Sequence, residues 1–472
     1  MTNGSGLADA GGLYGDGTGV PLVEFRPYRD VVQEVSVMRT RLIIAIVLAV
    51  LFAACGDDDG LTSTSTTGGA TSTSAGSSST TEGVTTTTGP GGSSGWARIP
   101  HDDAVFGVVD PSWMWAVIYG ATAAGPGVVA VGDRFPSVDY SDRPGVWTSP
   151  DGVAWAMVPH DEAVFGGVMS GYVEAVAAGP LGLVAVGTEY RGDDYDAVVF
   201  TSPDGRAWTR VPDPGGVFGG SGWQAMHAVT AGGPGWAAVG YDDSGEDRNA
   251  AVWTSLDGVT WTRVPHDESL FGGVNDQEIF GVVAAGRGLV AVGNDDEAPA
   301  AWVSADGVTW EKVPTDRFSS DPDYENVDKV MRAVAATPGL GLVAVGYLEW
   351  YSEATDTEDA DAAVWVSEDG LSWVLVSEDA AMFGGPDDQK MAAVTAGGPG
   401  FVAVGWDRSG GDANAAVWDS PDGTNWTRVP DAAVFTGAGD QEMYGVGVGA
   451  SRVVAVGRDG VNAAVWVSPP PG

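Results

Sequence analysis

Ser-Leu-Asp-Gly-Val-Thr-Trp, residues 255–261, is one of six copies of a Ser-x-Asp-Gly-x-x-Trp motif in the chain. Repeats with a period near 50 residues are typical of β-propeller blades, which stack around a common axis. The motif therefore predicts a propeller. Its aspartates, at intervals of 53, 53, 49, 63 and 53 residues, are Asp151, Asp204, Asp257, Asp306, Asp369 and Asp422.

Each interval contains four short segments rich in β-branched and aromatic residues, separated by Gly, Pro and Asp turns. In the third complete repeat we expect strands at residues 225–231, 236–240, 250–255 and 259–264. No segment has a sustained apolar period of 3.6 residues, so we expect almost no helix.

The number of blades follows from counting strands. The second and third strands of the repeat each occur seven times, but a fourth strand after an Asp-Gly turn occurs six times. The missing copy lies at the front, where residues 96–100 (Trp-Ala-Arg-Ile-Pro) match residues 261–265 (Trp-Thr-Arg-Val-Pro). We therefore expect an all-β, seven-bladed propeller of four-stranded antiparallel blades over residues 96–472. Pairing of residues 96–99 with the C-terminal blade would close the ring and cover a sheet edge.

The heptapeptide resembles the Asp-box, or bacterial neuraminidase repeat, which lies on the hairpin between the third and fourth strands of propeller blades. The resemblance implies a structural role for the six aspartates, because their carboxylates can accept N–H groups of the turn while Gly permits positive φ. These copies lack one residue between Asp and Gly, so we expect a tighter hairpin. Thirteen of the 19 Trp residues follow the repeat, and we expect them in the core between sheets.

The N-terminal region has the layout of an export signal. Residues 38–54 contain two arginines followed by thirteen apolar residues, too short a run to span a bilayer. The sequence Phe-Ala-Ala-Cys at residues 52–55 resembles a bacterial lipoprotein box, which implies cleavage before Cys55 and its acylation; the alternative is an incidental or buried cysteine. We interpret residues 1–37 as an over-long gene start and the Ser/Thr/Gly-rich residues 55–95 as a flexible tether. An extracytoplasmic domain anchored by lipid to the cell membrane is predicted.

The acidity of the chain excludes one class of partner. With 22 Lys+Arg against 64 Asp+Glu, the formal charge is −42, so nucleic-acid binding is not expected. The acid gathers in the long connections, for example at Asp242, Asp243, Glu246 and Asp247. These carboxylates form a candidate Ca²⁺ site, although simple solvated acid explains them as well. We expect no other cofactor, and the single cysteine excludes internal disulfides.

Aromatic residues outside the repeat mark a candidate ligand face. They lie in or beside the long connections at one end of the ring, where aromatic rings next to carboxylates suit stacking on sugars or gripping a basic peptide; local loop packing is the alternative. The candidates are Trp113, Trp223, Tyr241, Tyr347, Trp350, Tyr351 and Trp406, and Tyr195 also lies in these connections.

Two functions remain open. The first is a monomeric, membrane-anchored binding or scaffold protein for a glycan or protein ligand. The second is a sialidase-like glycoside hydrolase, whose resemblance implies an Arg cluster, an acid and an activated Tyr; the strongly negative face and the seventh blade argue against it. Three Arg side chains converging beside a Tyr–Glu pair would favour the hydrolase. The residues to watch are Arg134, Arg332, Arg408, Arg458, Tyr324 and Tyr444.

Overall fold

The computed structural model describes residues 95–107, 116–124, 127–134, 143–166, 170–191, 194–233, 235–245, 247–286, 288–318, 327–352, 357–376, 380–398, 400–449 and 452–470. The chain divides into two units, residues 1–83 and 84–472, and every described residue belongs to the second. The predicted signal segment, Cys55, Trp113, Glu246 and Tyr324 lie outside the described residues, as does the side chain of Tyr351. Within the described part of the chain, no helix has the length and apolar character needed to cross a bilayer.

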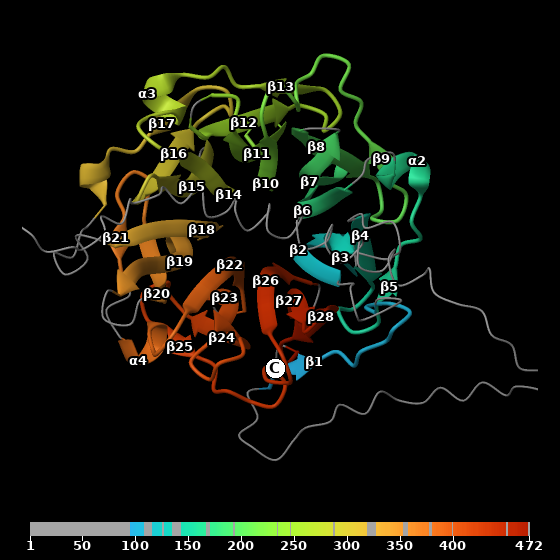
Figure 1. Cartoon of the computed structure of the whole chain (residues 1–472), viewed down its shortest axis with the longest axis vertical. Coiled ribbons are helices and arrows are strands. Elements are labelled where there is room, and N and C mark those ends of the chain that lie inside the picture. The colour runs from blue at the N-terminus through green and yellow to red at the C-terminus, as the bar shows by residue number, and fades with distance from the viewer. Residues whose placement is uncertain are drawn as a thin grey trace, which may run out of the picture. The chain divides into compact units, whose positions relative to one another are not determined.

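The described residues form seven four-stranded antiparallel sheets arranged in a ring, so the predicted seven-bladed propeller is confirmed (Figure 1). We number the blades in chain order from the first complete one. Their strands are β2–β5 (Ala116–Ala124, Gly127–Arg134, Arg143–Ser149, Ala156–Met157), β6–β9 (Ser170–Gly179, Gly182–Arg191, Asp194–Ser202, Thr209–Arg210), β10–β13 (Gln224–Gly232, Gly235–Asp242, Asn249–Ser255, Trp261–Arg263), β14–β17 (Gln277–Ala285, Gly288–Asp295, Ala298–Ser304, Trp310–Lys312), β18–β21 (Asp328–Thr337, Gly341–Ser352, Thr357–Ser367, Val374–Leu375), β22–β25 (Gln389–Gly397, Gly400–Asp407, Asn414–Ser420, Thr427–Arg428) and, in blade 7, β26–β28 (Gln441–Val448, Val453–Asp459, Asn462–Val467) with β1 (Ala97–Arg98).

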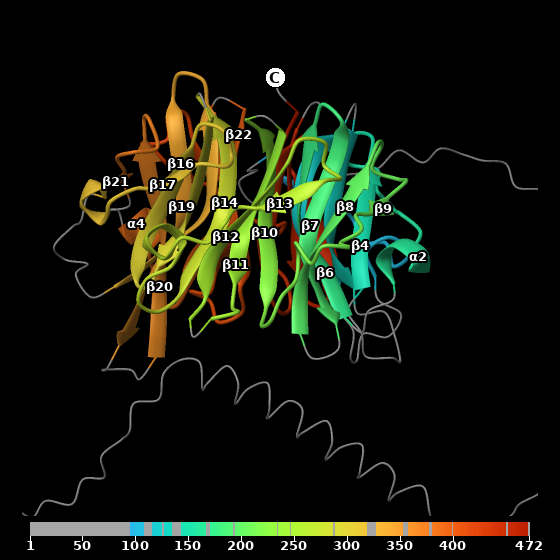
Figure 2. The same ribbon diagram turned by 90° about the horizontal axis from the view of Figure 1, so that it is seen from above.

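The two ends of the ring differ (Figure 2). Hairpins between first and second, and between third and fourth, strands lie at one end, which we call the short-hairpin end. The remaining connections lie at the opposite, loop-rich end. Strand β1 pairs antiparallel with β28, with Ala97 opposite Val467, so the chain enters the ring at the short-hairpin end.

The repeated hairpins show why the motif has its composition. In blade 3, Asp257 Oδ1 accepts the N–H groups of Val259 and Thr260, and Gly258 has a φ of 77°. Because these N–H groups stabilise the charged carboxylate, the pKa of Asp257 falls to about 2. The Trp261 indole donates back to the Gly258 carbonyl at 2.9 Å. The expected structural role of the motif aspartate is therefore visible in its contacts.

Trp side chains fill the spaces between neighbouring sheets. The third-strand positions are the most deeply buried, at no more than 1% exposure, and are occupied by Trp147, Phe200, Trp253, Trp302, Trp365, Trp418 and Trp466. Burial of an aromatic side chain of this size stabilises the folded state by a few kcal/mol, and the repeat places one in every blade.

The connections from one blade to the next are more regular than the sequence analysis assumed. They carry the four-residue helices α2 (Glu162–Phe165), α3 (Glu268–Phe271) and α4 (Ala380–Phe383), and a 3-10 turn, η1 (Thr315–Arg317). The connection that leads into blade 4 contains the sequence Phe-Gly-Gly-x-x-x-Gln, in which Phe271 and Gln277 are buried. The carbonyl of Leu270, just before Phe271, accepts the Trp302 indole N–H at 2.8 Å. The same pattern recurs at residues 218–224, 383–389 and, with Thr for the first Gly, 435–441.

Candidate functional site

The first strand of every blade lines the axis and contains a β-bulge at the same level. The bulge explains the glycine that ends each Ala-Val-Gly run on the second strand: a Cβ on Gly240 would lie 2.0 Å from the Ala225 carbonyl oxygen. The bulged residues surround the axis towards the loop-rich end, and we call them the axial belt. They are Tyr119, Glu174, His227, Phe280, Arg332, Ala392 and Tyr444.

Neighbouring belt residues contact one another. His227 Nδ1 lies 2.5 Å from Glu174 and its ring centroid 5.6 Å from that of Phe280. The Arg332 guanidinium lies 4.1 Å from the Phe280 centroid. The ring centroids of Tyr444 in blade 7 and Tyr119 in blade 1 lie 5.7 Å apart, so the belt residues of the last and first blades are also in contact.

His227 is the most strongly bound member of the belt. Its Nε2 lies 2.6 Å from Glu278 of the next blade, so one imidazole joins carboxylates from blades 2 and 4. Burial alone would lower the pKa of His227, but Glu174 and Glu278 outweigh that effect and raise it to about 10. His227 is therefore an imidazolium at neutral pH, with both of its nitrogens occupied.

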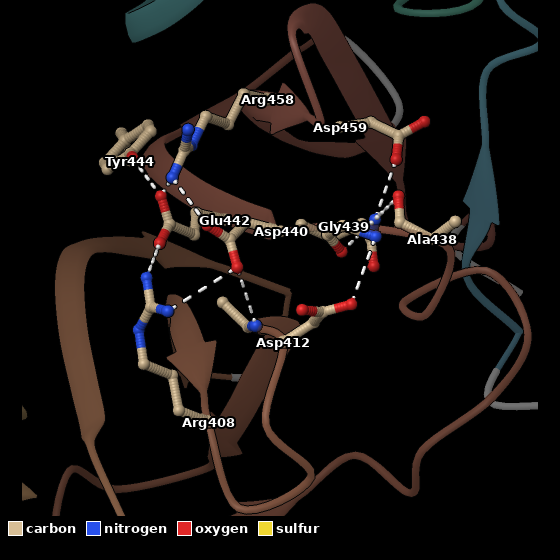
Figure 3. Close-up of polar contacts among 11 residues, drawn as sticks. Arg408, Asp412, Ala438, Gly439, Asp440, Glu442, Tyr444, Arg458 and Asp459 are labelled. Carbon is tan, nitrogen blue, oxygen red and sulfur yellow. Dashed lines mark hydrogen bonds and ion pairs between the residues drawn. The ribbon is translucent and has the colours of Figure 1, made fainter.

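A second cluster surrounds Glu442 at the start of β26 (Figure 3). Its carboxylate accepts from Arg408 Nη2 and Arg458 Nε, both at 2.7 Å, and from the Tyr444 hydroxyl. The Glu442 side chain is 4% exposed, whereas the side chains of both arginines are about a third exposed. Asp440 lies 3.5 Å from Arg408 and 3.2 Å from Arg458. The arginines are therefore neutralised by carboxylates of this chain.

The same inter-blade pair recurs elsewhere with its charges exchanged. Lys390 occupies in β22 the position of Glu442 in β26, two residues before the bulge. Glu349 occupies in β19 the position of Arg408, three residues after the Gly of the second strand. Lys390 Nζ donates to Glu349, so blade 6 holds blade 5 by the same contact with opposite signs. Recurrence of this contact with exchanged signs indicates that it holds neighbouring blades together, and we call it the clamp.

The arginines considered for a sialidase site do not all converge. Arg408 and Arg458 meet at Glu442, but Arg332 lies on blade 5 over Phe280. Arg134 ends β3, in register with Arg143.

An Arg-x-Pro sequence recurs at the fourth strand of several blades, at residues 98–100, 210–212, 263–265 and 428–430. In five blades, the Arg or Lys of the fourth strand forms an ion pair with an acidic residue that lies two positions after the second-strand Gly. In blade 5 two buried leucines, Leu348 and Leu375, take the place of this pair. The ion pairs are Asp459–Arg98, Glu189–Arg210, Asp242–Arg263, Asp295–Lys312 and Asp407–Arg428.

This periodic pair also uses Asp242, one of the candidate Ca²⁺ ligands. Asp242 binds Arg263 and accepts from Gln224 Nε2 at 2.9 Å and the Ser244 N–H at 3.0 Å. Asp243 and Asp247 belong to the same connection. Among the described residues, no group of three or more His, Cys, Asp or Glu side chains is placed to hold a metal ion.

The candidate aromatic residues do not form one surface. Tyr241 is 9% exposed and lies between His227 and Arg248, and Trp350 packs against the core of blade 5. Tyr347 lies under Lys390 Nζ, 4.4 Å from its centroid. The Trp406 ring makes a T-shaped contact with Tyr444, a residue of the axial belt.

Trp223 stands apart from these residues, because its side chain is 43% exposed. Its ring centroid lies 5.1 Å from that of Tyr195, which lies 4.9 Å from Tyr190 directly across the β7–β8 pair. The three rings form a cluster at the loop-rich end of blades 2 and 3, which we call the shelf, with neighbouring ring planes inclined at 53° and 70°. Arg191, Asp194 and Asp196 alternate with the two tyrosines along the hairpin and therefore face its opposite side. Sequence reasoning found Trp223 and Tyr195 but missed Tyr190, whose signal was its place opposite Tyr195 in a hairpin.

No protein-family model matches the chain, and no curated protein matches its sequence. Solved structures do resemble it. One, from the GH130 family of mannoside phosphorylases, is 14% identical, covers 76% of this chain and 86% of its own, and has a TM-score of 0.31. Zg3597, a family 117 glycoside hydrolase from Zobellia galactanivorans, is 13% identical over 61% and 92%, with a TM-score of 0.35. Sqt1 from Chaetomium thermophilum is 12% identical over 76% and 97%, with a TM-score of 0.40. At these values the likenesses carry no argument about function.

Proposed function

We propose that the chain is an exported, lipid-anchored Asp-box propeller that binds a glycan at its loop-rich end. The single observation that supports this is the shelf of Tyr190, Tyr195 and Trp223, in which the half-buried tyrosines support the exposed Trp223 ring. Exposed aromatic faces stack on the C–H faces of sugar rings.

The proposed anchor is compatible with a free loop-rich end. Because β1 starts at the short-hairpin end, a tether that precedes it would join the propeller at the end opposite the shelf. Changing Cys55 to Ser is expected to release the protein from the membrane fraction. Retention of the variant in that fraction would contradict the lipid anchor.

Glycan binding is tested on an array with the full chain. Trp223→Ala should reduce binding about five- to thirtyfold, because loss of one stacked aromatic ring costs about 1–2 kcal/mol. Trp223→Phe should retain part of the affinity. Leu256→Ala removes a side chain that is 71% exposed at the short-hairpin end and serves as the matched control. Equal binding by Trp223→Ala and wild type would refute the shelf.

One observation favours the sialidase-like alternative: Tyr444 and two arginines meet at Glu442. The sign-exchanged pair of Lys390 and Glu349 weighs against it. Turnover of a fluorogenic sialoside by the wild type, lost in Glu442→Gln, would establish the hydrolase instead of the binding protein.

A further inference from the structure

Two carboxylates face each other across the β7–β8 pair of blade 2, where Glu189 lies directly opposite Asp196. Like charges directly opposite each other in a sheet are destabilising. In blades 3, 6 and 7 the acidic residue at this place faces a neutral amide, in the pairs Asp242–Asn249, Asp407–Asn414 and Asp459–Asn462. Blade 2 therefore keeps a charge that the repeat avoids elsewhere.

A small cavity opens beside these two carboxylates, between β7, β8, β9 and the connection to blade 3. Its space is about 220 Å³ including the open mouth, less than the ~300–1,000 Å³ of pockets that enclose a whole small molecule. It can therefore hold one end of a ligand. Part of the lining is apolar, and the charged lining residues are Glu189, Arg191, Asp196, Arg210 and Asp213.

Most of these charges are paired with one another or with the backbone. Arg191 Nε lies 2.5 Å from Glu189 Oε1, and Arg210 donates to the same oxygen. Asp213 accepts two N–H groups of the connection to blade 3, at 2.7 and 2.9 Å. Glu189 Oε2 accepts no hydrogen bond from the described residues, although the Glu189 side chain is only 3% exposed.

Asp196 is the least neutralised of the lining residues. Among the described residues, the one cation within ion-pair distance is Arg191, at 3.7 Å, and none donates a hydrogen bond to the carboxylate. A Cβ on Gly219 would lie 2.3 Å from Asp196 Oδ1, so the connection to blade 3 packs directly on this group. Burial raises the pKa of the Asp196 carboxyl, and Arg191 offsets only part of this effect. With three carboxylates against two guanidiniums, one negative charge is left over in the cavity.

We propose that this cavity binds the primary ammonium group at the end of an alkyl chain. The ammonium donates to Asp196 and Glu189 Oε2, and the chain lies against the apolar lining, which includes Val211 and Phe218. An ammonium is compact and carries three donors, whereas a guanidinium requires a wider, planar site. Because Asp196 and the shelf tyrosines face opposite sides of the hairpin, this site goes beyond the proposed glycan binding and does not depend on it.

The test is a ligand-observed NMR titration of the full chain at neutral pH in about 0.15 M salt, where exposed charges are screened over about 8 Å. The probes are pentylamine, its neutral counterpart pentanol, and the capped peptide Gly-Gly-Lys-Gly-Gly. We expect pentylamine to bind at least tenfold more tightly than pentanol. Binding of the peptide as well identifies a lysine side chain as a source of the ammonium, and binding of pentylamine alone identifies a free amine. If neither amine binds more tightly than pentanol, the proposal is overturned.

Variants of Asp196 separate ligand binding from stability. Asp196→Asn gives blade 2 the neutral amide of blades 3, 6 and 7, so it should melt no lower than the wild type while losing at least tenfold in amine affinity. Asp361→Asn makes the same change at the equivalent position of blade 5, where the opposite residue is Leu348, and should bind amines like the wild type. A purely structural Asp196 would show the reverse, a lower melting temperature and unchanged amine binding, and that result would overturn the site.

Arg191→Gln supplies a second variant, because the Arg191 side chain is 48% exposed and its loss should be tolerated. Removing this cation leaves Asp196 without its ion-pair partner and should strengthen amine binding at least threefold. An affinity that fails to rise would overturn the assignment of Asp196 as the group that binds the ammonium.

Discussion

Changing Glu442 to Gln should destabilise the propeller, because this carboxylate neutralises two arginines from adjoining second-strand ends. Removing one partner of a buried ion pair costs about 3–5 kcal/mol. The Arg408 and Arg458 side chains are about a third exposed, and in the variant they would still contact Asp440 at 3.5 and 3.2 Å. We therefore expect a smaller loss of stability than this range, about 2–3 kcal/mol. With an unfolding entropy of about 2 cal/mol/K per residue over residues 96–472, the melting temperature should fall by roughly 3–4 °C.

The assay is calorimetric melting of the full chain at neutral pH, with Glu311→Gln, an exposed residue of β17, as control. The ion pair of Lys390 and Glu349 provides a second test. Lys390→Glu and Glu349→Lys should each lower the melting temperature, and the double variant should recover at least half of that loss. If Glu442→Gln melts like the wild type, the clamp reasoning is wrong. A higher melting temperature in Glu442→Gln would instead be the signature of a site kept for function at the cost of stability.

Three further perturbations test contacts that stabilise the propeller. The folded-state pKa of His227 is about 10, above the ordinary 6.5, so its contribution is complete below about pH 6.5 and is lost as pH rises through 10; melting should fall more steeply from pH 8 to 10.5 in the wild type than in His227→Gln. The pKa of Asp257 is lowered from 3.8 to about 2, so its contribution is present above about pH 3.8 and is lost as pH falls through 2; urea midpoints between pH 5 and 2 should change less in Asp257→Asn. Gly240→Ala would press Cβ against the Ala225 carbonyl and should cost about 3 kcal/mol in chemical denaturation, whereas Gly215→Ala, whose Cβ would lie at an ordinary contact distance of 3.7 Å from Val217 Cγ2, should be near neutral.

The sequence was sufficient to predict the ring because the residues that build it are repeated. The Asp-Gly turn and the buried Trp recur in almost every blade, and each has one local physical cause: a carboxylate capping a turn, and a large ring filling the space between two sheets. Tertiary context does not override such signals, so the strands predicted at residues 225–231 and 236–240 coincide with β10 and β11.

The axial belt could not be predicted in the same way. Its residue type changes from blade to blade, and a bulge on one strand becomes visible only when the register with its partner is known. The glycine after Ala-Val was visible seven times, yet its cause, the Ala225-type carbonyl pressing against it, lies on another strand. For the same reason the spacing of Glu442, Tyr444 and Arg458 in the sequence did not reveal that they meet.

Repetition also separates the candidate sites from the scaffold. A side chain that serves the ring must serve it in several blades, and the clamp at Glu442 reappears, with its signs exchanged, at Lys390. A side chain that serves a ligand has no reason to recur, because a ligand without sevenfold symmetry meets each blade differently. Arg332 and Ala392 have no counterparts of their kind in the axial belt, whereas the position of Trp223 is Trp again in the sequence of blade 1, at residue 115. Positions in the described part of the chain where the repeat is broken are therefore where we expect a ligand to bind, and those of the axial belt lie towards the loop-rich end.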